Sequence, residues 1–426
     1  MCIATFFSYC DIMQTGDELE AKMTAKSMMP YVEGNSAIRA MFEEGAKMAK
    51  KYGRENVYDF SLGNPSVPAP AEVNRAIKDI VDEEDSFLVH GYNQSNSGYE
   101  DVRQTVAKHL NRLHGTSFGS ENIIMTVGAA SGLNVAMKTL LDPGDEVLAF
   151  APYFVEYGNY AANHGAVLKA VPANTDGSGS ESGVPFQPNL NAMADMINAK
   201  TRAVIINSPN NPTGVIYSAE TLEKLAGILE AKSKEFGEPI YIISDEPYRE
   251  LAYDGAEVPY VTRFYSNTVV GYSWSKSLSL PGERIGYLVL PSEMDDFENA
   301  VQAANIANRV LGYVNAPTLM QRVAARCIEC TTDLEVYDRN RKALFEGLTE
   351  IGYECAYPQG AFYMWVKSPI DDEAEFCRLA KAHNILIVPG KSFACPGYVR
   401  IAYCVSHDTI VNSMPAFKVL YDEVRG

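Results

Sequence analysis

The sequence lacks long apolar runs, and it has too few basic residues to balance its acidic ones. No stretch approaches the ~18 apolar residues that a membrane-spanning helix needs, so no membrane partner is predicted. Lysine and arginine number 36 against 54 aspartate and glutamate residues, which gives a formal net charge of −18 over 426 residues. A negative field of this size repels phosphate backbones, so nucleic acid is not an expected partner.

Cysteine is also sparse and scattered. The only close pair is Cys327 and Cys330, with no second such pair and no histidine nearby, so no metal site is predicted and free thiols are expected. The N-terminal stretch MCIATFFSYCDIM has no preceding positive residue and is interrupted by Asp11, which is not typical of a signal peptide. These observations predict a cytoplasmic protein.

The middle third of the chain alternates strand-like and helix-like segments. The segment 218–237 predicts a helix with Ser218 as its N-cap and Gly237 as its stop. Alternation of such helices with nearly continuous apolar strands predicts an α/β fold, with a mostly parallel sheet covered by helices on both faces. The predicted strands are 121–127, 147–151, 203–207, 240–246 and 267–275.

The pattern changes near residue 310. A long helical stretch at 316–350 and short strands at 363–366 and 398–404 predict a smaller α+β domain. The predicted division is an N-terminal extension at 1–25 that is a candidate for disorder, a segment at 26–80 that joins the small domain, a large domain at 81–310 and a small C-terminal domain at 311–426.

Small, polar or charged residues follow the predicted strands where each one ends, and ligands of open α/β sheets bind at that edge. Taken singly, each has a structural explanation as a turn former, a helix cap or a core aromatic. Together they offer an anion site, a stacking surface, a buried carboxylate, hydrogen-bonding groups and a lysine near a second cation. They are Gly128-Ala129-Ala130, Tyr153-Phe154, Asn210-Asn211, Asp245 with Tyr248, and Ser273 with Lys276 and Arg284.

The lysine carries the chemistry of this set. Beside another cation in a desolvated site, its pKa is lowered and its amine becomes a nucleophile for carbonyl groups. Pyridoxal phosphate is the cofactor that needs a lysine Schiff base, a carboxylate against a pyridinium nitrogen and a phosphate cup.

Three ordered motifs carry a resemblance to a known family. SWSKSLSLPGERIG (273–286), NNPTG (210–214) and DEPY (245–248) resemble the central motifs of class I/II pyridoxal-phosphate-dependent aminotransferases of fold type I, and among them the aspartate aminotransferase-like members. Flanking segments at 62–70, 90–103, 358–365 and 388–403 are also similar to that family. The fold implied is a large domain with a mostly parallel sheet and a smaller α+β domain.

The resemblance implies roles at the cofactor ring. Lys276 would form the aldimine and then move the proton at the substrate Cα, and Asp245 would keep the pyridine nitrogen protonated. Asn211 and Tyr248 would hydrogen-bond the ring oxygen. Phe154 would stack on the ring, although many family members have tryptophan there.

It also implies roles at the phosphate and the substrate. The phosphate would be held by the backbone of Ala129 and Ala130, by Ser273 and Arg284, and by Tyr92 from a partner subunit, which implies a homodimer. The α-carboxylate of the substrate would be bound by Arg400, with Gly63 and Asn211 beside it.

The expected reaction is transamination from aspartate, or another small L-amino acid, to a 2-oxo acid, for which 2-oxoglutarate is the first choice. A dicarboxylate specialist needs a second cation, for which Lys138, Arg39 and Arg309 are candidates. If none of them reaches the pocket, aromatic or neutral amino acids are favoured. The same fold also serves C–S β-lyases and aminocyclopropane-carboxylate synthases. A cofactor-sensing regulator with a basic DNA-binding segment is a remote alternative, which the acidic composition disfavours.

Overall fold

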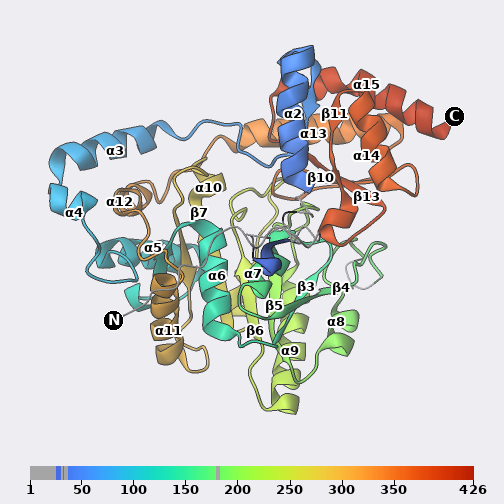
Figure 1. The fold of residues 1–426 in the computed structure, drawn as a ribbon. Helices are drawn as coiled ribbons and strands as arrows, with labels where there is room; N and C mark the ends of the chain where they lie inside the picture. The colour runs from blue at the N-terminus through green and yellow to red at the C-terminus, as the bar shows by residue number, and fades with distance from the viewer. Residues whose placement is uncertain (1–24, 30–31, 33–36, 179–182) are drawn as a thin grey trace, which may run out of the picture.

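A computed structural model describes residues 25–29, 32, 37–178 and 183–426. The predicted N-terminal extension, except for Ala25, lies outside the described residues. Figure 1 shows a large sheet with its helices in the lower part of the view and a smaller part above it that contains both α2 and the C-terminal helices.

The large sheet has seven strands in the order β2-β8-β7-β6-β5-β3-β4. Strand β8 is antiparallel to its neighbours β2 and β7, and the remaining pairs are parallel. This arrangement puts the carboxyl ends of six strands at one edge, which is where ligands bind in such sheets. The strands are β2 Ile123–Thr126, β3 Glu146–Phe150, β4 Val167–Val171, β5 Thr201–Asn207, β6 Tyr241–Asp245, β7 Thr268–Ser273 and β8 Gly286–Val289.

Helices cover both faces of this sheet, and its strands are therefore buried on both sides. Helices α6, α7 and α11 share a hydrophobic core with one face. On the other face, α8 and α9 pack near β5, while α3, α5 and α12 pack near β2. The predicted fold class is therefore confirmed. The helices between residues 71 and 326 are α3 Ala71–Glu83, α4 Ser86–His90, α5 Glu100–His114, α6 Gly128–Leu140, α7 Glu156–Ala162, α8 Leu190–Met196, α9 Ala219–Phe236, α10 Trp274–Ser277, α11 Phe297–Val310 and α12 Thr318–Arg326.

The smaller part is built around a four-stranded sheet in the order β12-β13-β10-β9, beside a two-stranded pair of β1 and β11. Its buried residues form a separate hydrophobic core with α13, α14 and α15. The elements are α2 Ala37–Tyr52, β1 Tyr58–Asp59, α13 Leu334–Ile351, β9 Cys355–Ala356, β10 Tyr363–Lys367, α14 Glu373–Ala382, β11 Ile385–Leu386, β12 Val388–Pro389, β13 Tyr398–Ala402 and α15 His407–Arg425.

Local sequence signals locate several boundaries correctly. The Ser218 side chain accepts a hydrogen bond from the backbone N–H of Thr221, and Gly237 ends α9 with a left-handed conformation, as predicted. The expected helix at 316–350 is wrong as a single element, because α12 ends at Arg326 and α13 starts after Asp333, whose side chain caps it. The strand expected to reach residue 275 ends at Ser273, where α10 begins.

The domain bounds stay a prediction. The core that contains α5 also contains α3 and α12, which lie beyond the predicted limits at 81 and 310. This shared core favours a proposal in which both helices count with the large domain. Within the described part of the chain, no helix combines the length and apolarity that crossing a bilayer requires.

Candidate active site

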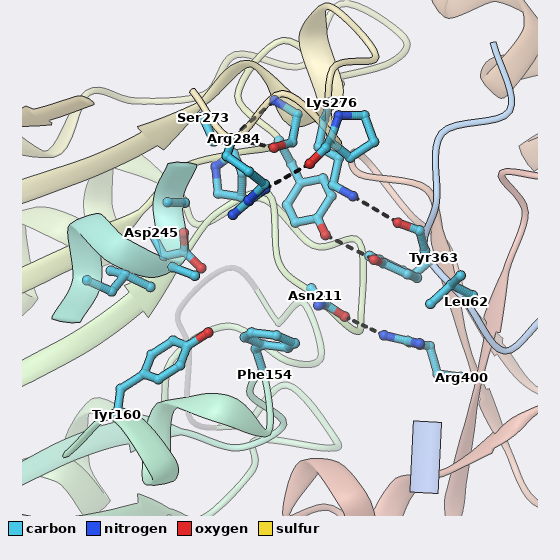
Figure 2. A pocket seen from close by; sticks show the side chains of 18 residues that line it. Leu62, Phe154, Tyr160, Asn211, Asp245, Ser273, Lys276, Arg284, Tyr363 and Arg400 are labelled. Atoms are coloured by element: carbon cyan, nitrogen blue, oxygen red, sulfur yellow. Dashed lines mark hydrogen bonds between the residues drawn. The ribbon is translucent and has the colours of Figure 1, made fainter. Parts of the chain in front are cut away.

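A cavity of about 270 Å³ lies at the carboxyl edge of the large sheet, where residues of the smaller part meet it (Figure 2). It brings together every site residue predicted from the sequence except Tyr92, whose side chain is 87% exposed and does not line it. The predicted residues that line the cavity are Gly63, Ala129, Ala130, Phe154, Asn211, Asp245, Tyr248, Ser273, Lys276, Arg284 and Arg400.

Lys276 reaches the cavity from α10, directly after β7. The Ser273 hydroxyl accepts a hydrogen bond from the backbone N–H of Ser275 and so starts this short helix. The Lys276 amine donates to the carbonyl of Gly63 at 2.8 Å. Burial lowers the pKa of Lys276 to about 8, with a further contribution from the positive charges of Arg400 and Arg284. A lysine amine with this pKa is mostly neutral once the pH is above about 8.

Asp245 ends β6 as a buried carboxyl group. Its Oδ2 accepts a hydrogen bond from the Tyr157 hydroxyl at 2.6 Å, whereas its Oδ1 is buried without a partner. Burial raises the pKa of Asp245 to about 7, against the opposing effect of the Tyr157 hydrogen bond. A buried carboxylate oxygen without a partner fits a ligand that presents a positively charged N–H.

An anion site lies at the start of α6. The first-turn N–H groups of Ala129 and Ala130 lack acceptors within the helix, and Arg284 lies beside them. Gly128 has φ +79°, and a Cβ there would lie 2.6 Å from the Arg284 Nη2. The positive φ favours glycine here, and the absence of a side chain leaves room for the arginine at this turn. The hydroxyls of Ser273 and Ser275, 2.6 Å apart, complete the site.

Arg400 is a buried arginine on β13 without a carboxylate partner among the described residues. Arg400 is 2% exposed, so it does not form a surface ion pair, which was the alternative explanation for an arginine in this strand. Its Nη1 donates to Asn211 Oδ1 at 3.1 Å and its Nη2 donates to the Ser61 carbonyl at 2.7 Å, while Nε is unpaired. A buried charge needs a counter-charge, so this guanidinium fits a carboxylate ligand.

The structure adds cavity residues that sequence reasoning missed. Tyr363 lies in the segment 358–365, whose resemblance to the family was the available signal. Tyr160 comes from α7, which had no sequence signal for a site, and Tyr157 on the same helix lies behind the lining, where it hydrogen-bonds Asp245. The other additional lining residues are Leu62, Leu133, Pro247 and Pro281.

Of the candidates for a second substrate cation, the two with described side chains do not line this cavity. Lys138 on α6 and Arg309 on α11 are exposed. Arg39 belongs to α2, but its side chain lies outside the described residues. Among the described lining residues, the cations are Lys276, Arg284 and Arg400.

Comparisons with known proteins identify the class of enzyme. The family model for aminotransferase class I and II matches residues 55–414. An aspartate aminotransferase of Thermotoga maritima is 31% identical over 377 residues, which cover 87% of this chain and 92% of that protein. An aspartate/prephenate aminotransferase of Thermus thermophilus is 32% identical over 326 residues, covering 75% and 81%.

A solved structure of an amino transferase from Eubacterium rectale is 49% identical, with a TM-score of 0.91, and the match covers 95% of this chain and 100% of that one. The fold and the cavity thus define an aminotransferase of fold type I. The chain belongs to the aminotransferase class I and II family, as the motifs predicted.

Enzymes of this family depend on pyridoxal phosphate, and the cavity residues fit that cofactor. The unpaired Asp245 Oδ1 is an acceptor for a protonated ring nitrogen, and the turn at Gly128 with Arg284 offers donors to a phosphate. Lys276 supplies an amine with a lowered pKa to the same cavity. Phe154 lines the same cavity with an aromatic face (Figure 2).

Proposed function

We propose that this aminotransferase takes the amino group of an L-amino acid, with aspartate as the first choice, and passes it to a 2-oxo acid, with 2-oxoglutarate as the first choice. The observation that carries the proposal is one cavity with the Lys276 amine and the buried Arg400 guanidinium. Aspartate is favoured because the relatives at 31% and 32% identity are named for it.

Arg400 would hold the α-carboxylate of either substrate. Its Nη1 and Nη2 are oriented by Asn211 and by the Ser61 carbonyl, so the guanidinium plane is fixed before a ligand arrives. The rings of Tyr363 and Phe393 lie 4.5 Å and 5.0 Å from its Cζ and exclude water from its faces. Binding there would bring the substrate Cα near Lys276.

Lys276 would act as the base at the substrate Cα and then as the acid. Its neutral amine would accept the Cα proton and then deliver it to the cofactor carbon that receives the amino group, which requires a pKa near the working pH. Pyridoxal phosphate, when bound, supplies the carbonyl that exchanges with the amino group and the ring that withdraws electrons from Cα. Asp245 would hold the ring nitrogen, and Asn211 and Tyr248 would hydrogen-bond its oxygen.

A screen of the first half-reaction tests the proposal. The holoenzyme is mixed with single L-amino acids, and absorption spectroscopy follows conversion of the bound cofactor to its amine form. Aspartate is expected to convert it, and 2-oxoglutarate to restore it with release of glutamate. Lys276→Ala is the matched control, with multiple turnover reduced by about two to four orders of magnitude. Full turnover in that variant would overturn the assignment.

A second substrate class has support from the cavity itself. Lys276, Arg284 and Arg400 all have assigned tasks, and the described lining holds no further cation for a distal carboxylate. Leu62, Phe154 and Tyr160 would suit an aromatic or neutral side chain. In the same screen, faster conversion by phenylalanine, tyrosine or leucine than by aspartate would select this class.

A β-lyase is distinguished by its products. The cofactor residues stabilise a carbanion common to transamination and β-elimination, so they do not separate the two. Release of pyruvate with ammonia or a thiol, without conversion of the cofactor to its amine form, would select the lyase reaction.

We also propose a homodimer as the working unit, in which Tyr92 reaches the phosphate end of the partner subunit's cavity. Its 87% exposure is unusual for a tyrosine, and it lies outside the cavity of its own chain.

A further inference from the structure

Tyr363 touches three of the proposed site groups at once. It is the first residue of β10, is 3% exposed, and lines the cavity from the smaller part of the molecule (Figure 2). Its hydroxyl lies 2.9 Å from the Tyr248 hydroxyl, and its ring centroid lies 4.5 Å from the Cζ of Arg400. The contact with Tyr248 joins residues 115 positions apart in the chain.

The third contact is with Gly63. A Cβ on Gly63 would lie 1.9 Å from the Tyr363 hydroxyl oxygen, so the absence of a side chain there makes room for this hydroxyl. The carbonyl of Gly63 is the acceptor for the Lys276 amine. Tyr363 is therefore packed against the backbone that orients the lysine.

The hydrogen bond between the Tyr363 and Tyr248 hydroxyls has a preferred direction if Tyr248 also hydrogen-bonds the cofactor. A phenol donates one hydrogen bond, and its oxygen can accept another. When Tyr363 donates to Tyr248, the Tyr248 proton is free to point toward the cofactor ring oxygen. Accepting a hydrogen bond also makes the Tyr248 hydroxyl a stronger donor, because linked hydrogen bonds polarise one another.

The ring of Tyr363 acts on a different group. Arg400 lies between Tyr363 and Phe393, whose ring centroid is 5.0 Å from the guanidinium carbon. A ring face near a desolvated guanidinium stabilises its charge and fixes its plane. The hydroxyl and the ring therefore serve two separate functions that two substitutions can separate.

We propose that Tyr363 is a positioning residue for the aminotransferase reaction: its hydroxyl directs the Tyr248 proton to the cofactor, and its ring holds Arg400 for the substrate carboxylate. The inference rests on the proposed roles of Tyr248 and Arg400. It predicts that removal of the hydroxyl affects the cofactor, whereas removal of the ring affects carboxylate binding.

The first test is spectroscopic. In Tyr363→Phe, the pH midpoint of the visible absorption change of the bound cofactor is expected to rise by about 0.5 unit, as suits the loss of one weak hydrogen bond. The rise is caused by weaker stabilisation of the ionised ring oxygen. Affinity for carboxylic acids is expected to stay unchanged.

The second test measures binding without reaction. Succinate and 3-phenylpropionate carry a carboxylate and no amino group, so their dissociation constants report on Arg400. In Tyr363→Leu, the dissociation constant of whichever acid binds the wild type is expected to rise about tenfold, and the KM of both substrates to rise with it.

A matched control separates positioning from general stability. Tyr353 is buried in the same hydrophobic core, and its hydroxyl donates to the Phe417 carbonyl at 3.0 Å. Tyr353→Phe is expected to leave both readouts unchanged. Equal changes in this control would overturn the proposal, as would wild-type behaviour of both Tyr363 variants.

The proposed function and the role of Tyr363 are contradicted by different results. A wild-type protein that converts no amino acid would contradict the proposed function. A wild-type protein that reacts as expected, with unchanged Tyr363 variants, would contradict the role of Tyr363 alone. If Tyr363→Leu does not fold, the pH midpoint of the cofactor absorption change in Tyr363→Phe tests the role of Tyr363: an unchanged midpoint would contradict it.

Discussion

At the residue scale, the chemistry depends on how burial changes two ionisable groups. Burial disfavours the charged form of both, so it lowers the pKa of Lys276 to about 8 and raises that of Asp245 to about 7. Nearby groups then act differently on the two. Arg400 and Arg284 lower the lysine pKa further, whereas the Tyr157 hydroxyl partly counteracts burial at Asp245.

The lowered lysine pKa has a direct consequence for the apoenzyme. The rate at which pyridoxal phosphate reacts with Lys276 is expected to rise with pH, with a midpoint near pH 8, because only the neutral amine attacks a carbonyl. Stopped-flow absorption measures this rate. Arg400→Met is expected to move the midpoint upward, since it removes a positive charge that opposes protonation. A midpoint near the ordinary lysine pKa would contradict the burial argument.

The sequence predicted the motif residues of the site and missed the tyrosines whose hydroxyls contact them. Lys276 and Asp245 were predicted because charged residues inside apolar segments are conspicuous, whereas Arg400 was predicted from the resemblance to the family. Tyr157 and Tyr363 carried no such signal, because a tyrosine in an apolar segment is usually a core residue. Their polar contacts depend on which hydroxyl oxygen or carboxylate the fold brings opposite them.

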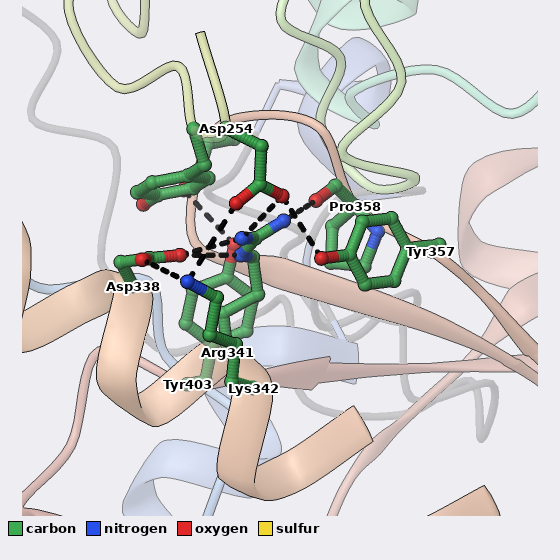
Figure 3. A network of polar contacts seen from close by, with 9 residues as sticks. Asp254, Asp338, Arg341, Lys342, Tyr357, Pro358 and Tyr403 are labelled. Atoms are coloured by element: carbon green, nitrogen blue, oxygen red, sulfur yellow. Dashed lines mark hydrogen bonds and ion pairs between the residues drawn. The ribbon is translucent and has the colours of Figure 1, made fainter. Parts of the chain in front are cut away.

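At the element scale, one buried arginine on α13 connects this helix to distant loops (Figure 3). Arg341 is fully buried and pairs with Asp338 at 2.5 Å and with Asp254 at 2.7 Å. It also donates to the Pro358 carbonyl at 2.9 Å. Since Asp254 follows the β6 segment and Pro358 precedes β10, the network fixes the segment that leads to Tyr363.

Removal of this arginine is expected to destabilise the fold. Arg341→Met should lower the free energy of unfolding by about 2 kcal/mol, because it removes the hydrogen bonds of a fully buried guanidinium and leaves the Pro358 carbonyl without its donor. Denaturant unfolding measures the loss. Lys342→Met is the matched control: Lys342 pairs with the same two aspartates but is 47% exposed, so its loss should cost less than about 1 kcal/mol. Equal losses in the two variants would refute a special role for Arg341.

Element boundaries were predicted where a local residue specifies them. Ser218 and Gly237 delimit α9 by side-chain capping and by a left-handed conformation, and both are readable from the sequence. The break between α12 and α13 was missed, because residues 327–333 contain no glycine or proline to mark it. The local signal is the single N-cap residue Asp333, and the packing of the two helices into separate cores accompanies the break.

At the scale of the whole molecule, the proposed homodimer makes a prediction about mixed subunits. Lys276→Ala and Tyr92→Leu damage different halves of one site if Tyr92 acts across the interface. Co-expressed subunits with distinct tags should form hybrids in which one site contains both intact residues. The purified hybrid is therefore expected to be more active than either variant alone.

The control is a hybrid of Lys276→Ala with Asp245→Asn, in which the two lost residues are also on different chains. Both residues line the same chain's cavity, so neither site of this hybrid is complete. It should remain as inactive as its parents. A monomer in light scattering, or a Tyr92 hybrid as inactive as this control, would contradict the cross-subunit role.

The sequence by itself determined the fold class, the family and the residues that line the cavity from each strand end. Those features follow from local apolar patterning and from short motifs, in which the chemistry and the spacing are set along the chain. The tertiary structure decided which groups meet across the cavity. Lys276 and the Gly63 carbonyl are 213 positions apart, and Arg400 and the Ser61 carbonyl are 339 apart. Such contacts arise only when segments that are far apart in the chain pack together, so no local pattern could contain them.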